Sequence, residues 1–130
     1  MRLLGLDRPL PAAIATAQTR AIDAGHCNAL PAAMLPAMAR AQIARDAFMA
    51  LKIHEHRARG ALLLAGNGHV RRDIGVPRWL PAASDVHVVG YLETADDEGS
   101  RYDRTVVTAR AARADPCEAL LKSRAAKPAR

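Results

Sequence analysis

Apolar residues recur at helical spacing in two stretches in the first half of the chain. The first stretch predicts a helix over residues 9–24, with a proline at its start and Gly25 just beyond its end. The apolar residues at this spacing are Ile14, Ala17, Ala21 and Ile22. The second stretch predicts a longer helix over residues 31–59, with Gly60 as its stop. Pro36 lies inside this pattern and predicts a kink or a restart.

Short apolar runs in the second half predict strands. Residues 61–65, ALLLA, are uniformly apolar, which is typical of a strand buried on both faces of a parallel sheet. Residues 67–81 then predict a long loop with one helical turn. Residues 85–93 and 105–108 have the composition of strands, with an acidic turn over 96–100 between them. A last short helix is predicted with Asp115 as N-cap and Pro116 at its first position.

The order of these elements predicts an α/β fold, in which a layered, partly parallel central sheet is flanked by helices. The chain has 130 residues, which fits one small domain. Its aromatic residues are one Phe, one Trp and two Tyr, so the core is expected to be thin and mostly aliphatic. Few strands and few large apolar residues together indicate an incomplete half of a larger domain.

The positive charge is concentrated at the C-terminus. The chain has 19 Lys and Arg against 13 Asp and Glu, a formal charge of +6, and four of the cations lie in residues 122–130. This segment has no apolar periodicity, and we expect it to be a basic, disordered tail. Because there are so few aromatic rings to stack on bases, binding to nucleic acid is not expected.

The apolar stretches are short for membrane insertion or export. The longest uncharged apolar stretch, residues 29–39, falls well below the ~20 residues of a membrane helix. At the N-terminus, Asp7 interrupts the apolar run too early for a secretory signal. The chain as given is therefore expected to have no transmembrane segment and to remain in the cytoplasm if translated from its first residue.

Three polar residues interrupt the apolar face of the helix predicted over residues 31–59. They are Gln42, Arg45 and Asp46. The apolar residues near the same arc are Leu35, Met38, Met49 and Ile53. Because burial of an unpaired charge is costly, this face either pairs Arg45 with Asp46 in a structural network or lines a polar pocket.

The segment Gly66-Asn67-Gly68-His69 directly follows the predicted strand over residues 61–65. In open parallel sheets, ligands bind beyond the carboxyl ends of the strands. The two glycines permit a sharp turn, so that Asn67 and His69 can face the same cavity. The alternative is that His69 only caps the turn.

The remaining histidines and the cysteines give weaker signals. His54 and His56 point about 200° apart on a helix and therefore cannot bind one ion together. His87 alternates with valines and is expected at the surface. Cys27 and Cys117 are too few for a disulfide scaffold, and from the residues alone one bridge or two reduced thiols are both open.

These motifs together resemble the ChaN-like haem-binding and iron-regulated proteins, whose superfamily includes the TIKI and erythromycin-esterase-like proteins. The resemblance is carried by residues 41–50, AQIARDAFMA, residues 65–73, AGNGHVRRD, and the GVP of residues 75–77. In these runs Gln42, Arg45 and Asp46 match a Q-x-x-R-D pattern, and His69 matches a Gly-Asn-x-His pattern. The supporting positions are His26-Cys27, Gly90-Tyr91 and Asp115-Pro116-Cys117.

The resemblance implies a non-enzymatic protein of bacterial haem or iron uptake, in the periplasm or anchored to the cell envelope. Its cofactor would be haem, with the iron held through it. The implied ligand-binding residues are His69, Asn67, Gln42, Arg45, Asp46, Arg72, Tyr91 and His26. The axial ligand is left open among His69, Tyr91 and Tyr102, and Arg45, Arg71 or Arg72 would pair with the propionates. The resemblance also implies a Cys27–Cys117 disulfide.

Proteins of this family are about twice as long, so residues 1–121 resemble the C-terminal portion of the domain. A homodimer or the missing N-terminal half would then complete the pocket. The alternative function is a metal-dependent hydrolase in which His69 is a general base or metal ligand, assisted by Asp46 and oriented by Asn67. A third possibility is an inactive fragment.

Overall fold

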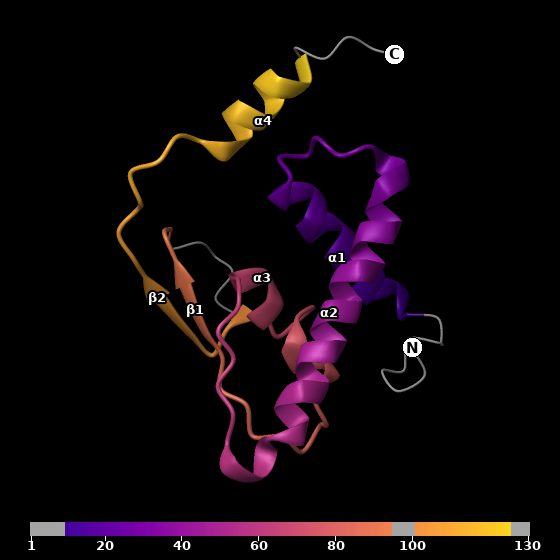
Figure 1. Cartoon of the computed structure of the whole chain (residues 1–130), viewed down its shortest axis with the longest axis vertical. Helices are drawn as coiled ribbons and strands as arrows, with labels where there is room; N and C mark the ends of the chain where they lie inside the picture. Colours follow the sequence, from indigo (N-terminus) through magenta and orange to yellow (C-terminus); the bar gives the residue numbers. More distant parts are fainter. Residues whose placement is uncertain (1–9, 95–100, 126–130) are drawn as a thin grey trace.

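The computed structural model describes residues 10–94 and 101–125, and its two longest helices pack against each other (Figure 1). Helix α1 is Ala12–Gly25, and helix α2 is Leu35–Glu55, preceded by the 3-10 helix η2, Ala32–Met34. Both predicted helices are confirmed. Pro36 lies in the first turn of α2, where its missing N–H costs no hydrogen bond. It therefore marks a restart of the helix and does not kink it.

Small residues allow α2 to pack closely against its neighbours. Its buried apolar residues, Ala39, Ile43, Ala47 and Ala50, recur at helical spacing. Helix α1 packs against α2, and so does the 3-10 helix η4, Val76–Trp79. Ile74 and Val76 are almost fully buried and complete this core. The core is thin and mostly aliphatic, as expected, because three of the four buried apolar residues of α2 are alanines.

The connection after α2 carries the segment with the candidate histidine. It contains the 3-10 helix η3, Arg57–Arg59, and then Gly60, whose φ of 74° is left-handed and favours glycine. The single turn α3, Asn67–Val70, follows, and η4 comes after it. Helix α2 therefore ends at Glu55, before the predicted end at residue 59, and Gly60 terminates η3 instead. The predicted loop contains two helical turns, α3 and η4, where one was expected.

Gly75 fixes the position of α3 against η4. A Cβ on Gly75 would lie 2.2 Å from the backbone oxygen of His69 and 2.8 Å from that of Arg71. The Gly75 N–H donates to the Arg71 carbonyl over 2.8 Å. Only glycine permits this close approach of two backbone segments. Gly75 therefore keeps the loop in contact with the backbone of His69 and Arg71.

The sheet consists of two short parallel strands. Strand β1 is Val89–Leu92 and strand β2 is Arg104–Val107, with Val89 opposite Arg104 in register. The prediction of parallel strands is confirmed, although β1 covers only part of residues 85–93. The ring of Tyr102 packs against Gly90, where a Cβ would lie 2.8 Å from the ring.

The strand predicted over residues 61–65 is wrong. Among the described residues no backbone hydrogen bond joins this run to another segment, and Leu62 and Leu64 are each 87% exposed. A strand requires hydrogen-bonded neighbours, and the described part of the chain places none beside this run. The apolar pattern therefore indicates a segment suited to burial, but it does not show whether a neighbour is present.

The C-terminal helix α4, Pro116–Ala125, is joined to the helical part by a disulfide. The N–H of Cys117 donates to the Asp115 carboxylate over 2.8 Å, as expected for an N-cap residue. Cys117 is bonded to Cys27, which lies in a left-handed turn after α1. The bridge spans 90 residues, and closing such a loop stabilises the folded state by about 4 kcal/mol in the chain-entropy model.

Some predicted features lie outside the described residues. These are the acidic turn over residues 96–100 and residues 126–130 of the basic segment, whereas residues 122–125 belong to α4. Across 10–94 and 101–125, none of the helices has both the length and the apolar character that a membrane span requires.

We expect Gly75→Ala to destabilise the fold. The added methyl group would collide with the backbone of α3, and overpacking of this kind costs about 1–3 kcal/mol. Urea unfolding measures the change. Gly25→Ala is the matched control, because a Cβ there meets nothing within 4 Å. Equal unfolding free energies for the two variants would contradict the account of the Gly75 contact.

Candidate functional site

The site is centred on a histidine held between two helical segments. The Nδ1 atom of His69 on α3 lies 2.5 Å from Oδ1 of Asp46 on α2. The side chain of Asp46 is fully buried, whereas that of His69 is 23% exposed. An aspartate beneath a partly exposed imidazole fixes the ring orientation while leaving part of the ring open to a ligand.

Gln42 completes the cluster one helical turn before Asp46. Its Nε2 lies 3.0 Å from Nδ1 of His69 and 3.1 Å from Nε2. If the Nδ1–H of His69 donates to Asp46, the accepting nitrogen of the ring is Nε2, and the Gln42 amide donates to it. Gln42 therefore covers the nitrogen that a ligand would use. The structure brings these three predicted residues together.

Burial dominates the electrostatics of Asp46. Its desolvation raises the pKa of the carboxyl above the ordinary 3.8, against opposing effects of the His69 hydrogen bond, the His69 charge and the Arg45 charge. The second carboxyl oxygen, Oδ2, is buried and has no hydrogen-bond partner among the described residues. The site thus contains one unused buried acceptor beside the histidine.

Arg45 and Asn67 occupy different positions from those expected for a shared pocket. Arg45 is exposed and makes no hydrogen bond or ion pair within the described residues, so the alternative of an Arg45–Asp46 ion-paired network is not observed. Asn67 donates through Nδ2 to the carbonyl of Tyr91 over 2.6 Å. Its amide therefore ties α3 to β1 and does not contact His69.

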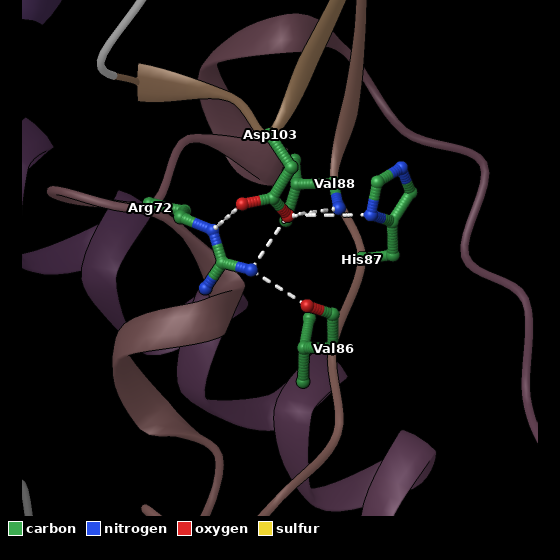
Figure 2. Close-up of polar contacts among 5 residues, drawn as sticks. All are labelled: Arg72, Val86, His87, Val88 and Asp103. Carbon is green, nitrogen blue, oxygen red and sulfur yellow. Dashed lines mark hydrogen bonds and ion pairs between the residues drawn. The ribbon is translucent and has the colours of Figure 1, made fainter.

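Arg72 is committed to a separate polar cluster (Figure 2). Its Nε and Nη2 donate to the two carboxylate oxygens of Asp103 over 2.6 and 2.5 Å, and Nη2 also donates to the Val86 carbonyl. Asp103 also accepts the Val88 N–H, and His87 lies 3.9 Å away. The Arg72 hydrogen bond is the main influence that lowers the pKa of Asp103. This cluster joins the loop after α3 to both strands.

The other predicted ligand residues lie around this centre. Tyr91 is 61% exposed on β1, whereas Tyr102 is buried and its hydroxyl donates to the Asn67 carbonyl over 3.4 Å. His26 ends α1, and its Nδ1 donates to the Ile22 carbonyl over 2.7 Å. Among the described contacts, none joins His26 to His69.

An apolar cavity of about 400 Å³ adjoins α3, a volume typical of pockets for small molecules. Ile53, Val70, Val76 and Tyr91 contribute to its wall, together with residues 61–64 and 85–89. Gln42, Asp46 and His69 do not line it. The polar cluster and the apolar cavity are therefore neighbouring features that meet along α3, where Val70 follows His69.

The described residues contain no cluster of side chains that would bind a metal ion by itself. No group of three or more His, Cys, Asp or Glu there is arranged to hold a metal ion. The cluster around His69 contains one histidine and therefore offers a single imidazole ligand. Such a ligand suits a metal whose other positions are filled by a cofactor.

Sequence reasoning did not single out Gly75 as a positioning residue or Asp103 as the partner of Arg72. Gly75 was visible only as part of the GVP segment, and its contact depends on the fold of the loop. Asp103 lies 31 residues from Arg72 in an exposed, charged segment, and its sequence context carries no signal for the pairing. The contact depends on the parallel register of the strands.

Comparison with protein families gives one match. The family model described as haem-binding uptake, Tiki superfamily, ChaN matches residues 5–80, which is more than half of the chain. The matched range contains α2 and α3, and thus the whole Gln42–Asp46–His69 cluster. No curated protein and no solved structure matches the chain.

We expect the raised pKa of Asp46 to appear in the pH dependence of stability. The pKa of Asp46 is higher in the folded than in the unfolded state. Its contribution to the free energy of unfolding is therefore fully present at low pH and is lost as pH rises through the folded pKa. Asp46→Asn should therefore become progressively more stable relative to wild type as pH rises from 3.5 towards 7, with ~3.8 as the unfolded reference. Urea unfolding at each pH measures this difference.

Asp103→Asn is the matched control with the opposite sign. The pKa of Asp103 is lowered, so its contribution appears above the unfolded pKa and is lost as pH falls through the folded pKa. This variant should lose stability relative to wild type as pH rises. The same sign for both variants would contradict the assignment of a buried, desolvated Asp46.

Proposed function

Because this chain belongs to the ChaN family of haem-binding uptake proteins in the Tiki superfamily, we propose that it binds haem with His69 as the axial ligand of the iron. The observation that carries this proposal is the contact of His69 Nδ1 with the buried Asp46. A metal-binding histidine commonly donates its second ring N–H to a carboxylate, which orients the ring and increases its basicity.

The residues around His69 fit a single-ligand role. Haem supplies four porphyrin nitrogens to its iron, so the protein needs to supply few ligands of its own. His69 is partly exposed, whereas Tyr102 is buried beneath Gly90 and bonded to the Asn67 carbonyl. Gln42 must leave Nε2 before a ligand can take it, and the unpaired Oδ2 of Asp46 can accept the displaced amide.

The surroundings offer an apolar surface and cations for the two ends of a porphyrin. The cavity beside α3 is lined mainly by aliphatic side chains and by Tyr91, with Asp85 and His87 also in its wall, and the apolar part suits the ring of the cofactor. We assign propionate binding first to Arg45, which is exposed and makes no hydrogen bond or ion pair within the described residues. Arg72 is the second choice, because it must exchange its bidentate contact with Asp103.

We further propose that the protein acts in bacterial haem or iron uptake, without enzymatic activity, in the periplasm or anchored to the cell envelope. The Cys27–Cys117 bridge supports an oxidising compartment, since disulfides rarely persist in the cytosol. A second copy or a segment corresponding to the other half of the domain would complete the pocket, whose wall at residues 61–64 is open.

A hydrolase is the second candidate, and the His69–Asp46 pair is the observation that favours it. A general base oriented by a carboxylate uses the same arrangement. A metal-dependent hydrolase would need ligands from beyond the described residues in addition to His69. Ester hydrolysis that is abolished by a chelator would support this candidate over haem binding.

We expect purified protein to bind hemin saturably, with a shifted Soret band. His69→Ala should remove the shift, and Asp46→Asn should weaken binding by about 10–100-fold, because it alters the partner of the ligand. His56→Ala is the matched control, since His56 is exposed at the end of α2, does not line the cavity and should leave binding unchanged.

Circular dichroism checks that each variant remains folded. Non-saturating absorbance in wild type that is unaffected by these substitutions would contradict haem binding and would favour an inactive fragment. Equal losses in His69→Ala and His56→Ala would contradict the assignment of the axial ligand.

A further inference from the structure

A second hollow lies where α1 packs against α2, apart from the cavity beside α3 (Figure 1). It is an open groove of about 650 Å³, a volume within the range of ligand pockets. Arg40 lines the groove, whereas Gln42 belongs to the His69 cluster. Two residues apart on a helix, these side chains point about 200° apart, so the groove and the polar cluster lie on different sides of α2.

The floor of the groove is aliphatic. Ala39 and Ile43 of α2 are almost fully buried there, and Leu10 and Pro36 add apolar surface to the wall. None of the described residues that line the groove is aromatic, so a planar ring finds no partner for stacking. The groove therefore suits an alkyl chain better than a porphyrin.

The two helices each contribute one cation to the groove. Arg20 of α1 and Arg40 of α2 are exposed, and neither makes a hydrogen bond or ion pair within the described residues. The described wall contains no carboxylate to neutralise them. By contrast, Arg72 and Arg113 each hold a carboxylate of this chain. Two guanidinium groups on facing helices can bind one anionic group from both sides.

A threonine adds a hydrogen-bond donor at the same end of α1. The hydroxyl of Thr19 donates to the Ala15 carbonyl over 2.8 Å, so its hydrogen is already used. Thr16 lies one helical turn before Arg20, also lines the groove, and makes no hydrogen bond through its hydroxyl within the described residues. Its hydroxyl can therefore donate to an anion held by Arg20.

We propose that this groove binds an amphiphile with a single alkyl chain and an anionic head group, a carboxylate or a phosphate. The head group lies between Arg20 and Arg40, and the chain covers Ala39 and Ile43. Because the groove is concave, its occupant is a single molecule inserted between the helices, and not the flat surface of a bilayer. This site is separate from His69 and goes beyond the proposed haem site.

Calorimetric titration of the haem-free full chain tests the proposal with dodecanoate and, separately, with dodecyl phosphate, both below their micellar concentrations. We expect saturable binding of at least one of them, and the one that binds identifies the head group. Arg20→Gln and Arg40→Gln should each raise its dissociation constant at least tenfold. Dodecyltrimethylammonium has the same chain with a cationic head group and should not bind.

Arg59→Gln is the matched control, because Arg59 is exposed on η3 and does not line the groove. It should leave the dissociation constant unchanged. Circular dichroism checks that each variant remains folded. Failure of both anionic amphiphiles to bind saturably would overturn the proposal, and so would equal affinities in wild type and the two groove variants. None of these titrations contains hemin, so failure of the groove and failure of the haem site are distinguishable.

Discussion

A buried carboxylate beneath a histidine is the interaction on which the site depends. Asp46 is excluded from solvent on α2, and its carboxyl group contacts the imidazole of His69. Burial of this carboxyl group without a hydrogen-bond partner would be unfavourable, so its contact with His69 links the position of α3 to α2. Gly75 allows that position, because it lets the loop after α3 pass against the His69 carbonyl.

The supporting contacts form a chain from the site to the periphery. Asn67 joins α3 to β1, and the Arg72–Asp103 pair joins the following loop to both strands. Tyr102 packs over Gly90 and reaches back to the Asn67 carbonyl. The short sheet therefore stabilises the histidine from one side while α2 stabilises it from the other. Arg72 has a structural role here that its position in the sequence does not indicate.

The local elements could be predicted from the sequence because they depend on neighbouring residues. The spacing of small apolar residues, the proline in the first turn of α2 and the glycine stop at Gly60 each carry a local physical reason. The strand over residues 61–65 could not be decided in this way, since a strand depends on a neighbour that the run itself does not specify. The Arg72–Asp103 pair was missed for the same reason, because it depends on strand register.

Part of the site could be predicted from the sequence. Helical spacing placed Gln42 and Asp46 on the same face of α2, and the Gly-Asn-x-His segment indicated His69. The prediction did not separate side chains that face the histidine from those that hold the loop, such as Asn67. Nor did it separate the polar cluster from the apolar cavity, which meet only along α3. Haem would contact both the polar cluster and the cavity only if His69, which precedes Val70 in the cavity wall, binds the iron.

The most direct test of this account is chemical rescue of the axial ligand. His69→Gly removes the imidazole and leaves its partners Gln42 and Asp46 in place. We predict that this variant loses the histidine-ligated haem spectrum and that added imidazole restores it, with weaker rescue when Asp46→Asn is also present. A histidine-ligated spectrum in His69→Gly without imidazole would contradict the central claim that His69 binds the iron.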